Sequence, residues 1–377
     1  MEDLRDKLHK KGLNAWAKNN YKGTLLYGTG SGKTWCGIKA MNHFYKKDKN
    51  SKFLIVVPRI PLMSNWETEI NKAKSSELLN NIEFICYASI TKYKLKVYDL
   101  VILDEIHHCT SLKRMEFLIM NKSDRILGLT ASLTYLQKYK LFKYAPVVDE
   151  YSLKEANKDG VVSDFEIYTI PVELTFEERL LYNALGKSAD EYFDKSGKAG
   201  WKVIGKRTRL LHSAVNKIHM GVKLAELFKK EYGVIFSLSI DVSNEIAELV
   251  PNCLPLHSKL SKNKIKKNIE LFSDENSPIK TLSTPTMLDE GITLPRLSYS
   301  IMLSRYSKER QTIQTVGRNV RKDDDPNKLA ILVRVYCKNT AEEKWLRKSF
   351  SGFNVKNLNN YEEFENIIKE KRKNISQ

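Results

Sequence analysis

The sequence predicts an α/β protein of two domains, each built on a parallel sheet flanked by helices. Residues 1–150 alternate short apolar runs with helical patterns, which is the rhythm of strand–helix–strand units. A second series of the same kind runs from residue 223 to residue 335. The length of 377 residues suits two domains with a small additional element.

The first domain is predicted to span residues 1–150. Its apolar runs predict strands at residues 23–27, 53–57, 82–86, 100–103 and 125–129. Helical patterns fall at residues 4–18, 33–45 and 61–73. The strands therefore alternate with helices, as a parallel sheet requires.

The second domain is predicted to span residues 151–345 and to contain a helical insertion at about residues 175–222, where strand-like runs are missing. Thr175 is placed to cap a helix that starts at Phe176. Strands are predicted at residues 233–237, 279–283, 300–303 and 330–335, and helices at 223–230, 242–249, 263–272 and from 309. Residues 346–377 read as a helical tail with a basic run at 369–373.

The charge of the chain favours a polyanionic partner. Lys and Arg number 63 against 45 Asp and Glu, a net charge of +18, which favours nucleic acid first and an acidic membrane second. A lysine-rich coding bias is the alternative. Between residues 187 and 223, nine basic residues face three acidic ones, with aromatic residues interleaved.

The chain is expected to be cytoplasmic and monomeric. No apolar run approaches the roughly 18 residues of a membrane span, so no membrane partner is expected. The N-terminus is charged and does not read as a signal peptide. The five cysteines are scattered without a CxxC pair, which predicts neither disulfides nor a cysteine zinc site.

A glycine-rich loop at residues 27–34, YGTGSGKT, lies between the first predicted strand and a helix. Such loops wrap phosphates with backbone N–H groups, the lysine reaches the β- and γ-phosphates, and the hydroxyl holds Mg²⁺. Tyr27 stands where the pattern usually has Gly or Ala. ATP and Mg²⁺ are therefore the expected ligands, and the binding residues are predicted to be Gly28, Thr29, Gly30, Ser31, Gly32, Lys33 and Thr34.

Two carboxylates follow an apolar strand at residues 104–107, DEIH. The carboxyl ends of parallel strands share one edge of the sheet, so these groups should lie beside the glycine-rich loop. Asp104 suits Mg²⁺, directly or through water. Glu105 suits the group that orients and deprotonates an attacking water.

A distant motif, QTVGRNVR at residues 314–321, places Arg318 and Arg321 on one helix side, with Gln314 one turn earlier. Arginines supplied from a second domain can stabilise the charge that develops on a transferred phosphoryl group. An ordinary basic helix face is the alternative interpretation.

These motifs, with LTAS at residues 129–132, resemble a superfamily 2 helicase of the DEAH/DEIH-box type over nearly the whole chain. The resemblance implies two tandem RecA-like P-loop domains. Within that family, residues 151–156, 172–175 and 288–292 are similar to XPB-like DNA helicases and phage UvsW-type branch-migration helicases.

The resemblance also implies roles for individual residues. His107, Thr130 and Ser132 would link hydrolysis to domain movement. Pro58, Arg59, Ser89 and Thr286 would contact the nucleic-acid backbone, and Gly291 would lie in the motif that joins nucleic acid to the ATP site. His9 stands where relatives often have a Gln that reads adenine, and Arg59 where a Thr is common.

The predicted function is an ATP-dependent DNA helicase or translocase of replication, recombination or repair, which acts on single-stranded, forked or branched DNA. Three alternatives remain open. These are an RNA helicase, the motor subunit of a restriction or defence complex, and a nucleic-acid-binding module that has lost turnover.

Overall fold

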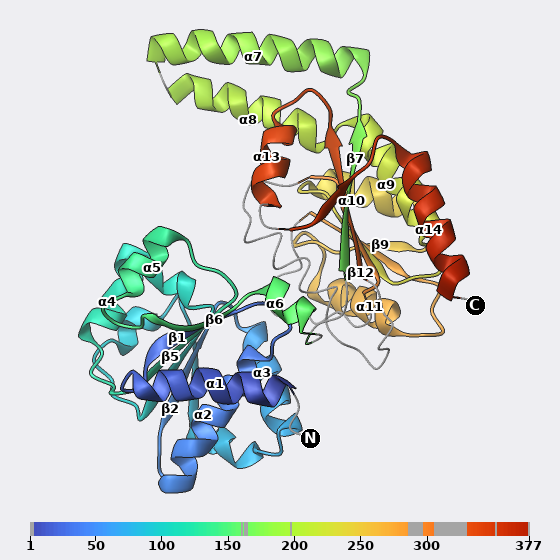
Figure 1. Cartoon of the computed structure of the whole chain (residues 1–377). Coiled ribbons are helices and arrows are strands. Elements are labelled where there is room, and N and C mark those ends of the chain that lie inside the picture. Colours follow the sequence, from blue (N-terminus) through green and yellow to red (C-terminus); the bar gives the residue numbers. More distant parts are fainter. Residues whose placement is uncertain are drawn as a thin grey trace. The chain divides into compact units, whose positions relative to one another are not determined.

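The computed structural model describes residues 4–159, 161, 165–196, 198–285, 297–304, 330–350 and 353–375 (Figure 1). Contacts within the chain divide it into two compact units. The first takes the described residues as far as Val161, and the second takes the described residues from Phe165 onward.

Unit 1 is built on a six-stranded parallel sheet with the strand order β3-β2-β4-β5-β1-β6. The central strands β2 and β5 are fully buried, as expected of a sheet covered on both faces. The strands are β1 Lys22–Tyr27, β2 Phe53–Val57, β3 Ile82–Cys86, β4 Leu100–Asp104, β5 Ile126–Thr130 and β6 Val147–Tyr151.

Helices connect the strands of unit 1 on both faces of the sheet. The helices are α1 Leu4–Lys18, α2 Lys33–Lys47, α3 Pro61–Lys72, α4 Leu112–Met120, α5 Tyr135–Leu141 and α6 Leu153–Lys158, with short 3-10 turns η1 Ser76–Asn81, η2 Ile90–Tyr93 and η3 Ile106–Thr110. Thr134 and Ser152 begin α5 and α6 with capping boxes. In each box, the side chain of Gln137 or Glu155 accepts from the backbone N–H of the capping residue.

Unit 2 is built on a seven-stranded parallel sheet with the order β13-β7-β12-β11-β8-β10-β9. The strands are β7 Phe165–Val172, β8 Gly233–Phe236, β9 Cys253–Pro255, β10 Thr281–Thr284, β11 Tyr299–Met302, β12 Ala330–Cys337 and β13 Val355–Asn357. The helices are α7 Phe176–Ser196, α8 Lys198–His212, α9 Val215–Leu227, α10 Ile240–Leu249, α11 Lys262–Ser273, α13 Glu342–Ser349 and α14 Tyr361–Ile375.

The predicted helical insertion is a hairpin of two long helices, α7 and α8, that extends away from the sheet of unit 2 (Figure 1). The predicted cap is confirmed, since Glu178 N–H donates to Thr175 Oγ1 at 3.3 Å. At its base, Leu174, Tyr182 and Leu211 pack with Cys337 of β12 in one apolar cluster. The hairpin is therefore anchored to the sheet by a small core of its own.

The predicted fold class, two parallel-sheet α/β domains with a helical insertion, is confirmed. All five strands predicted for the first sheet are present, and β6 adds a sixth at its edge. In unit 2 the sequence missed β7, β9 and β13. The prediction of a wholly helical tail at residues 346–377 is therefore wrong, because β13 pairs with β7 and interrupts the helix. The helix predicted from residue 309 lies outside the described residues.

The basic run near the C-terminus packs onto unit 2. Lys371 and Lys356 both pair with Glu166, at 3.0 Å and 2.7 Å, and Arg372 pairs with Glu231 at 2.7 Å. Among the helices the structure describes, none has both the length and the apolar character to cross a membrane.

Candidate functional site

The glycine-rich loop joins the carboxyl end of β1 to the first turn of α2. Gly30 and Gly32 have φ values of 86° and 87°, in the left-handed region that other residues enter at a cost. Ser31 Oγ donates to the carbonyl oxygen of Gly28 at 2.7 Å. The loop therefore holds its shape through its own glycines and hydroxyl, at a helix N-terminus suited to anions.

The lysine of this loop contacts the loop backbone. Lys33 Nζ donates to the carbonyl oxygens of Tyr27 at 3.1 Å and Gly28 at 3.4 Å. Thr29, between Gly28 and Gly30, and Thr34, in the first turn of α2, are both half-buried. The predicted phosphate-binding residues are thus in one contiguous turn.

Tyr27, the departure from the usual loop pattern, is a packing residue. Its ring is fully buried, and its hydroxyl donates to Asp149 Oδ2 at 2.6 Å. A Cβ added at Gly12 of α1 would lie 2.0 Å from the same hydroxyl. Tyr27 contacts Lys33 through its backbone carbonyl, while its side chain contacts Asp149 and the carbonyl oxygen of Leu8.

His9 of α1 supports the loop from its inner side. Its Nε2 lies 2.8 Å from the carbonyl oxygen of Ser31, and its Nδ1 lies 3.4 Å from Lys39 Nζ. Burial lowers the pKa of His9, which favours the neutral ring. A neutral ring with its proton on Nε2 satisfies both contacts, since Nδ1 then accepts from Lys39.

Asp104 ends β4, and its carboxylate is oriented by a residue that sequence reasoning missed. Trp66 of α3 is buried and donates its indole N–H to Asp104 Oδ2 at 2.9 Å. A tryptophan 38 positions earlier carries no sequence signal of this role. Trp66 also lies against Gly37 of α2, so it bridges the loop helix and the carboxylate strand.

Glu105 follows with a left-handed backbone, φ 51° and ψ 54°. Its Oε2 accepts from Thr130 Oγ1 at 2.8 Å and lies 3.1 Å from His107 Nδ1. Burial would raise the pKa of Glu105, but the hydrogen bonds from His107 and Thr130 and the charge of Lys33 lower it to about 2. The carboxylate is therefore ionised at neutral pH.

The three residues predicted to couple hydrolysis to movement lie together at the ends of β4 and β5. His107 Nδ1 is 3.0 Å from Thr130 Oγ1, so His107, Thr130 and Glu105 all contact one another. Thr130 Oγ1 also lies 3.3 Å from the carbonyl oxygen of Ser132. His107 and Thr130 therefore contact the Glu105 carboxylate directly, whereas Ser132 contacts Thr130 through its backbone.

The predicted nucleic-acid contacts of unit 1 lie side by side at the same sheet edge. Pro58 and Arg59 follow β2, and Ser89 follows β3. Tyr87 N–H donates to the carbonyl oxygen of Val57 at 3.1 Å, which joins the two segments. Arg59 is exposed, whereas Pro58 and Ser89 are half-buried.

Five predicted site residues, Thr286, Gly291, Gln314, Arg318 and Arg321, lie outside the described residues. Their roles stay predictions. The segment at 305–329 that carries the arginines follows β11 and precedes β12.

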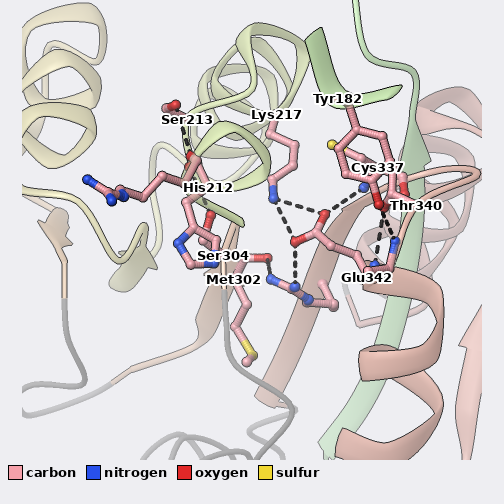
Figure 2. Close-up of polar contacts among 12 residues, drawn as sticks. Tyr182, His212, Ser213, Lys217, Met302, Ser304, Cys337, Thr340 and Glu342 are labelled. Atoms are coloured by element: carbon pink, nitrogen blue, oxygen red, sulfur yellow. Dashed lines mark hydrogen bonds and ion pairs between the residues drawn. The ribbon is translucent and has the colours of Figure 1, made fainter. Parts of the chain in front are cut away.

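A buried ion cluster that the sequence did not predict adjoins these strands in unit 2 (Figure 2). Glu342 accepts from Lys217 Nζ at 2.9 Å and from Arg334 Nη2 at 3.1 Å, and its side chain is 0% exposed. Arg334 Nη1 also donates to the carbonyl oxygen of Met302 at 3.1 Å, while Ser304 Oγ donates to that of His212 at 2.9 Å.

Hard oxygen ligands are available for a divalent metal. The Thr34 hydroxyl and the Asp104 carboxylate are the kind of donors that Mg²⁺ prefers, and both belong to the loop and strand edge of unit 1. Among the described residues, no group of three or more His, Cys, Asp or Glu side chains gathers around one point. This donor set fits a metal that keeps several waters and is shared with substrate phosphates.

The fold and the loop define the chain as a P-loop nucleoside triphosphatase of two parallel-sheet units. The family described as Type III restriction enzyme, res subunit, matches residues 2–134, and the helicase conserved C-terminal domain matches residues 216–323. The second match includes the predicted arginines. These two matches and a related translocase support a superfamily 2 helicase, an enzyme that hydrolyses ATP with a divalent metal and acts on nucleic acid.

Two relatives are similar to the chain over most of its length. The DNA 3'-5' translocase XPB2 of Sulfurisphaera tokodaii is 26% identical, over 92% of this chain and 84% of its own. The killer plasmid pGKL-2 helicase of Kluyveromyces lactis is 24% identical, over 80% of this chain and 58% of its own.

Two solved structures show the same fold. Dbp5 of S. cerevisiae bound to RNA and ADP BeF3 has a TM-score of 0.66 at 14% identity, covering 97% of this chain and 93% of its own. The ATP-dependent Type ISP restriction-modification enzyme LlaBIII bound to DNA has a TM-score of 0.63 at 15% identity, over 95% of this chain. The chain spans only 31% of that enzyme.

Proposed function

We propose that this chain is an ATP-dependent DNA translocase or helicase. The observation that carries the proposal is its 26% identity, over 92% of the chain, to a DNA 3'-5' translocase. The net charge of +18 supports a polyanionic partner.

The glycine-rich loop is proposed to bind the triphosphate of ATP. Backbone N–H groups of residues 28–32 and the first turn of α2 would wrap the phosphates, as a helix N-terminus favours anions. Lys33 would exchange its two loop carbonyls for phosphate oxygens. His9 would hold the loop backbone in place through its contact with the carbonyl oxygen of Ser31.

Glu105 is proposed to orient the attacking water and take its proton. Both described contacts of its carboxylate, with Thr130 and with His107, fall on Oε2. We therefore assign Oε1 as the oxygen that accepts the proton of the attacking water. Thr34 and Asp104 would hold Mg²⁺, which when bound neutralises phosphate charge. Trp66 would keep the Asp104 carboxylate oriented.

Arg318 and Arg321, with Gln314, are proposed to complete the hydrolysis site from the second domain. Thr286 and Gly291 are proposed to connect that site to nucleic acid. The match of the helicase C-terminal family to residues 216–323 supports these roles. Movement of the arginines toward and away from the phosphates would drive stepping along the strand.

DNA is proposed to contact Pro58, Arg59 and Ser89 in unit 1 and the α7–α8 hairpin in unit 2. Exposed basic residues of the hairpin region support the second contact. They are Lys187, Lys202, Lys206 and Arg209. Such contacts to phosphates give affinity without sequence preference.

Branch migration or unwinding of forked DNA in replication, recombination or repair is the finer role we propose. A specific observation favours a second candidate, because residues 2–134 match a restriction-enzyme subunit family. In that case the chain would serve as the motor of a restriction or defence complex. We also propose that the chain prefers DNA to RNA.

The test is ATP hydrolysis by the full chain with single-stranded, duplex, forked and four-way DNA, alongside RNA. Unwinding is scored on the same substrates. We expect DNA to stimulate turnover more than RNA, and forked or four-way DNA to be remodelled. Stronger stimulation by RNA would overturn the DNA assignment.

Lys33→Ala should abolish stimulated hydrolysis while DNA binding persists. Lys46→Ala is the matched control, because Lys46 is exposed at the far end of the same helix. Undiminished turnover in Lys33→Ala, with the control normal, would refute the assigned site.

A further inference from the structure

The outer face of α5 in unit 1 carries a line of exposed aromatic rings. Tyr135, Tyr139 and Phe142 are 87%, 73% and 76% exposed. Their spacing of four and three residues puts them on one side of the helix, about 6 Å and 4.5 Å apart along its axis. We call these three residues the α5 aromatic stripe.

The surroundings of the α5 aromatic stripe are basic. Lys143 is exposed beside it in the chain, and the half-buried Lys138 and Lys140 lie on the same short helix, where Lys138 pairs with Glu150 at 2.5 Å. Between Asp124 and Asp149 the chain contains no carboxylate side chain. Exposed rings beside three lysines, which outnumber the one carboxylate paired with them, Glu150, are suited to a polyanion that has flat faces.

The inner face of α5 is tied to the turn that carries His107. Lys140 Nζ donates to the carbonyl oxygen of Thr110 at 3.0 Å, and Gln137 Nε2 lies 3.5 Å from Thr110 Oγ1. Thr110 Oγ1 in turn donates to the carbonyl oxygen of His107 at 2.8 Å. The stripe is therefore held at a fixed place beside the hydrolysis site.

We propose that the α5 aromatic stripe is a binding site for single-stranded DNA, in which unpaired bases stack on Tyr135, Tyr139 and Phe142 while nearby lysines contact phosphates. The proposal rests on the proposed function. It adds a site that recognises the base faces, distinct from the backbone contacts assigned to Pro58, Arg59 and Ser89.

Physical chemistry favours this occupant over a protein. Leu136, 59% exposed on the same helix, adds one aliphatic side chain, but a docking surface for an apolar protein would lose from the neighbouring lysines. Stacking on bases needs planar rings in an accessible line, and the lysines add to it. Paired bases keep their faces inside the duplex, so the stripe should distinguish single strands from duplexes.

The test uses the full chain and measures fluorescence anisotropy with labelled dT20, a labelled blunt duplex and labelled rU20. Tyr139→Leu removes the ring but keeps apolar area, whereas Tyr139→Trp keeps a planar ring. Leu249→Ala in unit 2 is the control for loss of an exposed apolar side chain. Circular dichroism melting confirms that each variant is folded.

We expect Tyr139→Leu to bind dT20 at least about fivefold more weakly, while Tyr139→Trp and Leu249→Ala bind it within about twofold of the parent chain. Duplex affinity should change by less than about twofold in Tyr139→Leu. The DNA concentration for half-maximal ATP hydrolysis should rise with the dissociation constant for dT20.

Unchanged dT20 binding by Tyr139→Leu would overturn the proposal. Equal losses on dT20 and the duplex, or a loss confined to rU20, would overturn it as well, because the site would then not be one for single-stranded DNA. A parent chain that neither binds DNA nor is stimulated by it would instead refute the proposed function.

Discussion

At the scale of single residues, Tyr27 and Gly12 form a matched pair. A Cβ at Gly12 would lie 2.0 Å from the Tyr27 hydroxyl and 2.9 Å from its Cζ, and the ring is fully buried. Gly12→Ala should therefore lower the free energy of unfolding by about 1–3 kcal/mol, because the tyrosine must shift away from Asp149. Urea denaturation of the chain, followed by tryptophan fluorescence, measures this loss.

The double variant Gly12→Ala/Tyr27→Phe separates steric overlap from other causes. Removing the hydroxyl removes the nearest atom, so the double variant should be more stable than the sum of the two single losses predicts. Strict additivity would contradict the pairing.

Trp66 offers a test of how Asp104 is held. Trp66→Phe removes the indole N–H that donates to Asp104 Oδ2. Outer residues that orient metal-binding carboxylates typically contribute tenfold or more to metal affinity. We expect the Mg²⁺ concentration for half-maximal ATP hydrolysis to rise by about tenfold.

Trp16→Phe is the comparison, since Trp16 is equally buried but donates to the carbonyl oxygen of Ile126. A similar rise in the Mg²⁺ requirement for both variants would show that general destabilisation, and not Asp104, is responsible.

The sequence located the loop residues and the two carboxylates because their chemistry requires fixed residue types at fixed spacing. It could not locate Trp66, whose role depends on the packing of α3 against β4. It also could not show that Tyr27 points into the core, because a pattern records the residue and not the direction of its side chain.

At the scale of elements, the α7–α8 hairpin has a surface charge different from the one its sequence suggested. Lys217, counted among its basic residues, belongs to α9 and is 1% exposed against Glu342. Arg207 lies 3.8 Å from the centre of the Tyr182 ring and donates to the Tyr182 carbonyl oxygen. The remaining exposed lysines are the ones available to DNA.

Lys202→Glu/Lys206→Glu should weaken DNA binding by about tenfold or more at low salt, because each lost phosphate contact reduces counterion release. Both lysines are exposed on α8. Anisotropy measured at several salt concentrations should also show a smaller salt dependence.

Lys229→Glu/Lys230→Glu makes the same charge change on exposed lysines outside the hairpin. An equal loss of affinity in this pair would indicate that only the total charge matters, and the hairpin would lose its assigned role.

Elements were predictable where they were long or fully apolar. The buried strands β2 and β5 read directly from their apolar runs. By contrast, β9 and β13 have three residues each, and β6 is only partly buried at the edge of its sheet. Short edge strands are defined by pairing with distant partners, which a local pattern does not contain.

At the scale of the whole molecule, the buried polar cluster of unit 2 makes stability depend on pH. Burial lowers the pKa of His212 from 6.5 to about 4, helped by the charge of Lys217. The unfolded chain then binds a proton near pH 6.5 that the folded chain takes only near pH 4. The stabilisation is full above pH 6.5 and is lost as pH falls toward 4.

The expected loss is roughly 3 kcal/mol, from the size of the pKa shift. Urea unfolding at pH 7, 5.5 and 4.5 measures it, and His212→Asn should flatten the dependence in that window. Glu342 adds a loss at lower pH, because Lys217 and Arg334 outweigh burial and lower its pKa. If the free energy of unfolding fell as steeply with pH in His212→Asn, a group other than His212 would be responsible.

The contacts of Lys33 have a kinetic consequence for the catalytic cycle. Its ammonium is held by the carbonyl oxygens of Tyr27 and Gly28, and the loop is shaped by glycines that already have left-handed torsions. Because the loop glycines already hold these torsions, ATP binding should exchange the carbonyl contacts of Lys33 for phosphate oxygens without refolding the loop.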